Sequence, residues 1–137
     1  MTGLWIPGRP KTKGSLDFVP GRRCRCCSRC AAHLDGGFAK ENVAGSGRWR
    51  KLMSYALGGG EAFEAGPVSV AGVFALPVED VIAPRAGDLD KLARNLLDAL
   101  QDAQVYRDDV QVSRLLLDKI PAGERGPGVA VRVWRDE

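Results

Sequence analysis

The amino-acid sequence predicts a small α+β domain in which a mixed β-sheet packs against two main helices. Three observations lead to this fold class. The 137 residues are 45% hydrophobic and 27% charged, short runs rich in β-branched residues occur along the chain, and two stretches repeat apolar residues every three or four positions. The length suits one domain over residues 1–137. Because no apolar run could cross a membrane and no signal-peptide pattern opens the chain, we expect a cytoplasmic protein without a membrane partner.

The first half of the chain is expected to form one strand and one helix around an irregular segment. Residues 3–6 are apolar and end at a Pro-Gly pair, which predicts a strand followed by a loop. Residues from about 20 to 47 are rich in Gly, Cys and Arg, which indicates an irregular Cys/Arg-rich insertion. A helix is expected from about 48 to 57, with Ser46 as its N-cap. Its buried stripe consists of Trp49, Met53 and Leu57.

The second half is expected to supply the centre of the sheet and the longer helix. Residues 67–76 predict a central strand, residues 77–87 a loop, and residues 110–120 and 128–134 two further strands. The helix between them is the clearest element, because its apolar residues form one continuous stripe. The stripe is Leu89, Leu92, Ala93, Leu96, Leu97, Leu100 and Ala103. Strands and helices in this order favour a single layered α+β domain.

Charge is distributed unevenly along the chain. The net charge of +3 divides into +8 over residues 1–56, with eleven basic and three acidic side chains, and −5 over the rest. Such a division suggests a polyanion-binding part and a cation-binding part. The alternative is a chance dipole between two solvated faces.

Four aspartates stand at the two ends of the longer helix. Asp88 and Asp90 flank its first residue, while Asp108 and Asp109 lie between the helix and the next strand. Converging carboxylates would suit Mg²⁺, which takes hard oxygen ligands and keeps positions for water and phosphate oxygens. Alternatively, Asp88 is a helix N-cap, Asp90 complements the helix dipole, and the other two form a turn.

Two motifs of this region together resemble the RusA family of Holliday-junction endonucleases. They are Asp88-Leu-Asp-Lys-Leu-Ala-Arg-Asn-Leu-Leu-Asp-Ala-Leu100 and Tyr106-Arg-Asp-Asp-Val-Gln-Val112. The family pattern is Asp-x-Asp-Asn-Leu-x-Lys, then Leu-Asp-Ala-Leu, then Asp-Asp-x-Gln-Val. Residues 7–14 and 119–131 are also similar to family segments, whereas residues 20–47 have no counterpart.

The resemblance implies a homodimer that uses Mg²⁺ or Mn²⁺ to cut four-way DNA junctions with paired symmetric nicks, in DNA recombination and repair. It places Asp88, Asp90 and Asp109 at the catalytic, metal-binding carboxylate positions. The chain departs from the family at two positions, where Lys91 replaces an Asn and Arg94 replaces a Lys. Arg94 keeps a cation that could offset charge developing on phosphate. Lys91 adds a positive charge beside the expected metal.

The basic residues near the motifs and in the first half are candidates for DNA contacts, because phosphate contacts supply most nucleic-acid affinity without reading sequence. The candidates are Arg9, Lys11, Lys13, Arg48, Arg50, Lys51 and Lys91. Trp5 and Trp49 could stack on bases, but tryptophans beside apolar stripes are more often core residues, and we expect them in the core.

The insertion contains a cluster of cysteines that suggests a structural metal site. Cys24, Cys27, Cys30 and His33 offer four ligands at even spacing, as a tetrahedral Zn²⁺ site requires. Free thiols in a flexible basic loop are the main alternative, and an iron–sulfur cluster is a weaker one.

The leading functional hypothesis is therefore a structure-selective DNA endonuclease. A second is a junction- or single-strand DNA-binding protein with weak or no cleavage, because positions 91 and 94 depart from the family. A third is an enzyme acting on a small phosphoester, which would not explain the basic first half.

Overall fold

The computed structural model describes residues 3–13, 16–19, 38–41 and 44–136. Its elements in chain order are β1 (Leu4–Pro7), β2 (Leu16–Val19), β3 (Phe38–Glu41), α1 (Ser46–Leu57), β4 (Val68–Leu76), α2 (Val78–Val81), α3 (Leu89–Asp102), the 3₁₀ turn η2 (Asp109–Gln111), β5 (Val112–Pro121) and β6 (Gly128–Arg135). The predicted small α+β fold, with a mixed sheet and two main helices, is confirmed.

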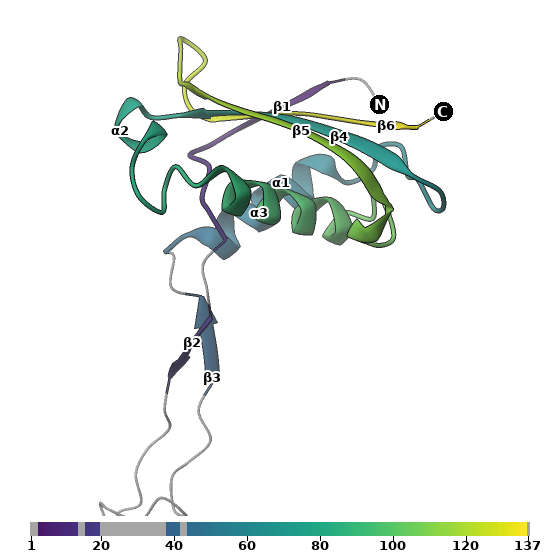
Figure 1. Ribbon diagram of the computed structural model, residues 1–137, viewed down its shortest axis with the longest axis horizontal. Coiled ribbons are helices and arrows are strands. Elements are labelled where there is room, and N and C mark those ends of the chain that lie inside the picture. The colour runs from purple at the N-terminus through teal and green to yellow at the C-terminus, as the bar shows by residue number, and fades with distance from the viewer. Residues whose placement is uncertain (1–2, 14–15, 20–37, 42–43, 137) are drawn as a thin grey trace, which may run out of the picture.

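The larger sheet has four strands in the order β1-β6-β4-β5. β4 lies at its centre, antiparallel to β6 and parallel to β5, and β1 pairs antiparallel with β6. The helices α1 and α3 lie side by side against one face of this sheet (Figure 1). β2 and β3 form a separate antiparallel pair that projects away from the sheet and helices (Figure 1).

The hydrophobic core fills the space between the helix layer and the sheet. α3 contributes a fully buried row with a spacing of four residues: Leu92, Leu96 and Leu100. α1 contributes Trp49, Met53 and Leu57, which confirms its predicted stripe. Trp49 is 4% exposed and is therefore a core residue, as expected. Trp5 is half-buried, with the Arg125 guanidinium 4.6 Å from its ring centroid.

One buried amide fastens the two helices and the first loop together. Asn95 on α3 is fully buried, and its Nδ2 donates to the carbonyl oxygens of Lys11, at 3.0 Å, and Ser46, at 3.3 Å. The backbone amide of Lys13 also donates to the carbonyl of Lys91, at 3.1 Å. These bonds hold the basic loop of residues 8–13 against α3, next to the expected catalytic aspartates.

The helix boundaries correct two details of the sequence prediction. Ser46 is the first residue of α1 and not its cap, because Gly45 takes the N-cap position with φ of 81°. The Ser46 hydroxyl instead lies buried beside Asn95, from which it accepts a hydrogen bond at 3.3 Å. The segment predicted as a loop over residues 77–87 contains the single turn α2.

Part of the predicted insertion lies outside the described residues. β3 lies within the segment that was predicted to be irregular, and it pairs with β2, which directly precedes that segment; neither strand was predicted. Cys24, Cys27, Cys30 and His33 all lie outside the described residues, so the zinc hypothesis stays a prediction. No helix among the described residues has both the length and the apolar character needed to span a bilayer.

Candidate active site

The start of α3 presents the first pair of aspartates to solvent. Asp88 occupies the N-cap position, as one alternative predicted, but its side chain makes no capping hydrogen bond. That carboxylate is 44% exposed and lies 3.8 Å from Nζ of Lys91. Asp90 is exposed in the first turn, where the positive end of the helix dipole favours an anion. Arg94 is exposed one turn later.

The second pair lies in the turn that leads from α3 into β5. Asp108 caps η2 through a capping box: its carboxylate accepts from Val110 N at 3.0 Å, and the Gln111 side chain accepts from the backbone of Asp108. Asp109 is the first residue of η2, and its backbone amide donates to Oε1 of Gln101 at 3.3 Å. The turn is therefore attached to the last residues of α3.

The carboxylate of Asp109 lies in an unfavourable electrostatic environment. Its pKa is raised above the ordinary aspartate value by a hydrogen bond with Asp108, by partial burial, and by the negative charges of Asp108 and Asp98. Lys13 acts in the opposite sense. Carboxylate oxygens are the ligands that Mg²⁺ prefers, and a cation relieves like-charge crowding of this kind. The carboxylate oxygens of Asp108 and Asp109 are therefore of the chemical type that binds a hard divalent cation.

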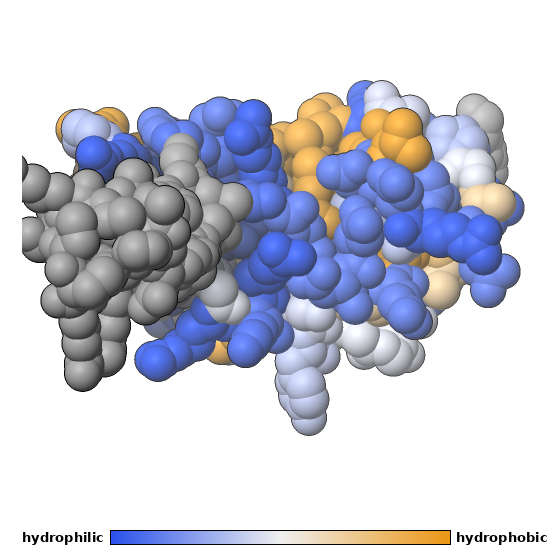
Figure 2. Space-filling model, turned by 90° about the horizontal axis from the view of Figure 1, so that it is seen from below, coloured by the Kyte–Doolittle hydropathy of each residue, from blue (hydrophilic) through white to orange (hydrophobic). Residues whose placement is uncertain are grey.

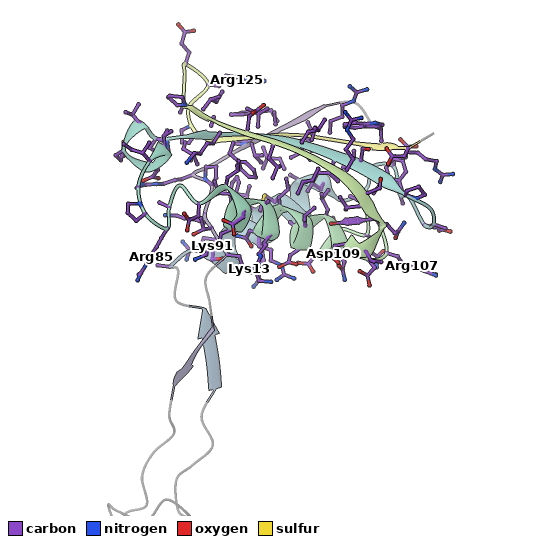
Figure 3. All side chains as sticks on the ribbon, in the orientation of Figure 1. Lys13, Arg85, Lys91, Arg107, Asp109 and Arg125 are labelled. Carbon is purple, nitrogen blue, oxygen red and sulfur yellow. The ribbon has the colours of Figure 1, made fainter. Side chains whose placement is uncertain are left out.

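The two pairs stand at opposite ends of the same helix. The rise of α3 between Asp90 and Gln101, which contacts Asp109, is about 16 Å. Figure 3 accordingly shows Lys91 near the start of α3 and Asp109 toward its other end. Among the described residues, no three Asp, Glu, His or Cys side chains form a group that could hold a metal ion. One chain thus brings Asp88 together with Asp90, and Asp108 together with Asp109, but does not join the two pairs.

Two of the predicted DNA-binding cations of the first loop are held in ion pairs. Arg9 donates two hydrogen bonds of 2.8 Å to the buried carboxylate of Asp80. Lys13 Nζ lies 2.5 Å from Oδ2 of Asp98 on α3. No sequence signal links Asp98 to Lys13, which lies 85 positions away in the chain. Only the fold reveals that these pairs position the loop.

The remaining predicted DNA-binding residues divide between paired and exposed positions. Arg50 on α1 donates to both carboxylate oxygens of Asp102, at 2.6 and 2.9 Å, and so ties α1 to α3. Arg48 and Lys51 are exposed on α1, and Lys11 is half-buried in the loop. Hydrophilic residues cover most of the coloured surface on this helix side of the molecule (Figure 2).

Comparison with known proteins places these elements in a family. The family described as Endodeoxyribonuclease RusA matches residues 48–134, which is more than half of the chain. The chain belongs to the RusA family. The match includes Asp88, Asp90, Arg94 and Asp109, so all four expected catalytic positions lie in the RusA domain. The basic loop of residues 8–13 and the cysteine cluster precede the matched segment. No curated protein matches the chain significantly.

Proposed function

We propose that this RusA-family protein is a divalent-metal-dependent endonuclease that resolves four-way DNA junctions by paired symmetric nicks. The observation that carries the proposal is the position of the two aspartate pairs at the ends of α3, within the matched RusA segment and exposed to solvent on its helix side. Carboxylates crowded by like charge, as at Asp109, are suited to holding a hard cation.

Each charged group around α3 has a distinct part in this proposal. Asp88, Asp90 and Asp109 would hold Mg²⁺ or Mn²⁺, which when bound polarises the phosphate and lowers the pKa of water. Arg94 lies one turn beyond Asp90, where its guanidinium can offset negative charge on a phosphate. Lys91 Nζ lies 3.8 Å from Oδ2 of Asp88, where its positive charge would help to orient that carboxylate.

DNA binding is proposed to rest on phosphate contacts, with the exposed Arg48 and Lys51 as the main described contributors from α1. The paired Arg9, Lys13 and Arg50 would act chiefly by holding the loop and α1 in place. Replacing Arg48 and Lys51 together by Ala should reduce the slope of log affinity against log salt by about two, because each lost phosphate contact contributes roughly one. An unchanged slope in a filter-binding or anisotropy titration would remove both residues from the interface.

The proposal includes a structural zinc site formed by Cys24, Cys27, Cys30 and His33. Bound Zn²⁺ would order this segment as a zinc knuckle and so hold its basic residues in position for DNA contacts. Elemental analysis of the purified protein tests it directly. One zinc per chain is expected, and a fully folded protein free of zinc would exclude the knuckle.

A second candidate function is a junction- or single-strand DNA-binding protein with weak or no cleavage. Two observations favour it: Lys91 lies 3.8 Å from a proposed metal-binding carboxylate, and the two aspartate pairs are separated within one chain. Incubation of a labelled four-way junction with Mg²⁺ distinguishes the two functions. Paired symmetric nicks support the endonuclease, whereas binding without nicks supports the alternative.

The decisive variant is Asp90→Asn, which removes a charged ligand but keeps the volume of the side chain. Cleavage should fall by at least about 10²-fold while junction affinity stays within twofold, if Asp90 acts only in the chemical step. The matched control is Glu124→Gln, which neutralises an exposed carboxylate in the loop between β5 and β6. Unchanged cleavage by Asp90→Asn would contradict the site assignment.

A further inference from the structure

The solvent side of α1 combines positive charge with an exposed aromatic ring. The helix contains three basic residues and no acidic one. Arg48 and Lys51 are exposed, and Tyr55 follows Lys51 by one turn on the same side of the helix. Tyr55 is 92% exposed, although proteins usually bury much of so large an aromatic residue. The helix therefore holds a ring with open faces next to cations that suit a polyanion.

A hollow lies beside this ring, where α1 and α3 end. Its first part has a volume of about 590 Å³, and its lining includes Tyr55, Gly58 and Ala103. A second part of about 500 Å³ continues from it, because Asp102 and Gln104 line both parts. Volumes of this size are typical of small-molecule sites in proteins, so the hollow has room for one nucleobase.

The hollow extends to the turn that holds Asp109. Gln101 and Arg107 line its second part, and Oε1 of Gln101 accepts a hydrogen bond from the Asp109 backbone amide at 3.3 Å. Figure 3 shows Arg107 and Asp109 close together toward this end of α3. A base that enters the hollow would therefore lie beside one of the two proposed carboxylate pairs.

The charges around the hollow suit an uncharged base better than a phosphate. Glu64 and Asp102 contribute two carboxylates to its lining, and Arg107 contributes one guanidinium. Asp102 is already paired with Arg50 on α1, so these charges balance. Without an excess of positive charge the hollow does not attract a phosphate, whereas its carboxylate oxygens can accept from the N–H groups of a base edge. Phosphates on either side of the base can instead meet the exposed cations of α1.

Gln104 is placed to contact the edge of such a base. It directly follows the C-cap of α3 with a left-handed φ of 60°, a position where glycine is the usual residue. Among the described residues its side-chain amide has no hydrogen-bond partner, and Gln104 lines both parts of the hollow. An amide offers both a donor and an acceptor to a base edge. A strained glutamine thus stands where glycine would fit better, and it supplies an amide at the hollow.

We propose that the hollow between Tyr55 and the Asp109 turn binds one unpaired base of DNA, with the Tyr55 ring stacked on the base and the Gln104 amide hydrogen-bonded to its edge. This inference rests on the DNA binding of the proposed function, but not on cleavage. A paired base is already stacked between its neighbours, so the subsite would favour branched or distorted DNA over a plain duplex.

A double-mutant cycle between protein and DNA tests the stacking. Two duplexes carry a single-nucleotide bulge, which is an adenine in one and an abasic site in the other, and binding is followed by fluorescence anisotropy without Mg²⁺. The wild type should bind the adenine bulge roughly 5- to 150-fold more tightly, as one stacked base contributes. Tyr55→Ala should lose this preference, and Tyr55→Phe should keep most of it. Leu52→Ala, at a neighbouring exposed residue of α1, is the matched control and should keep the full preference.

A second variant, Gln104→Gly, separates base recognition from folding. Relief of the left-handed strain should raise Tm, because glycine adopts a positive φ without steric cost. Loss of the amide should at the same time reduce the preference for the adenine bulge by about 2- to 10-fold. An unchanged preference would remove Gln104 from the subsite.

A wild type that binds both bulges equally, or a Tyr55→Ala variant that keeps the wild-type preference, would overturn the subsite and leave the proposed function intact. An equal loss in Leu52→Ala would overturn it as well, because the effect would then belong to the helix surface and not to the ring. Sedimentation of Tyr55→Ala covers the remaining occupant: half the wild-type mass would show that the ring is buried between two copies, which also overturns the subsite. A wild type that binds neither bulge nor a four-way junction would overturn the proposed DNA binding itself.

Discussion

Asn95 allows the sharpest test of how the fold positions the proposed site. Its amide is fully buried and donates to the carbonyl oxygens of Lys11 and Ser46, so Asn95→Ala leaves both acceptors without this partner. An unsatisfied buried group costs about 1–3 kcal/mol, and the small cavity adds to this, so we expect a loss of about 2–4 kcal/mol in the free energy of unfolding. Thermal unfolding followed by circular dichroism should show Tm lower by roughly 6–15 °C.

Two companion variants separate the hydrogen bonds from the packing. Asn95→Asp keeps the volume but replaces the Nδ2 donor by an acceptor facing two carbonyl oxygens, and it should destabilise at least as much as the alanine variant. Ser46→Ala removes only one acceptor, at 3.3 Å from Nδ2, and should cost less than about 1 kcal/mol. A loss below about 1 kcal/mol for Asn95→Ala would refute the reasoning, because the amide would then contribute no more than a surface hydrogen bond.

Two further predictions concern the loop and turn that flank Asp88. Gly87→Ala should lower the free energy of unfolding by about 1–3 kcal/mol and reduce nicking, because a Cβ at this position would lie 2.5 Å from the carbonyl oxygen of Asp80. Gly123→Ala is the control, since a Cβ there meets no atom within 4 Å. Urea unfolding should show no change in stability for this control. Arg9→Ala should destabilise more than Asp80→Ala, because it leaves the buried carboxylate unpaired while the arginine can reach water. The Arg9 guanidinium lowers the pKa of Asp80, so its stabilisation is present above about pH 4 and is lost as pH falls through the lowered value. The Arg9→Ala variant should therefore show a shallower loss of stability in acid, and an identical acid profile would contradict the pairing.

The spacing of apolar residues was enough to predict the main helices and strands, because the side chains that a helix or strand buries recur at a regular interval along the sequence. The row of leucines from Leu92 to Leu100 is the clearest example, since all of these positions on one helix face are buried against the sheet. Caps and short turns were harder to predict, because they depend on single backbone angles. Ser46 has the side chain of an N-cap, yet the left-handed Gly45 takes that position and Ser46 is drawn into the contact with Asn95.

The aspartate motif and its membership of the RusA family could be recognised from the sequence, because the types and spacing of those residues are local properties of the chain. Tertiary structure decided how the motif is arranged in space. The helical rise of α3 between Asp90 and Gln101, which contacts Asp109, is about 16 Å, so the two aspartate pairs lie toward opposite ends of this helix. Three predicted DNA-binding cations proved to be bound by aspartates on other elements, because ion pairs between distant segments form only when the chain folds. The sequence by itself therefore determined which chemical groups this protein has and on which elements they lie. Only the tertiary structure decided which of those groups are neighbours and which strands lie at the edges of the sheet, because both depend on contacts between residues far apart in the chain.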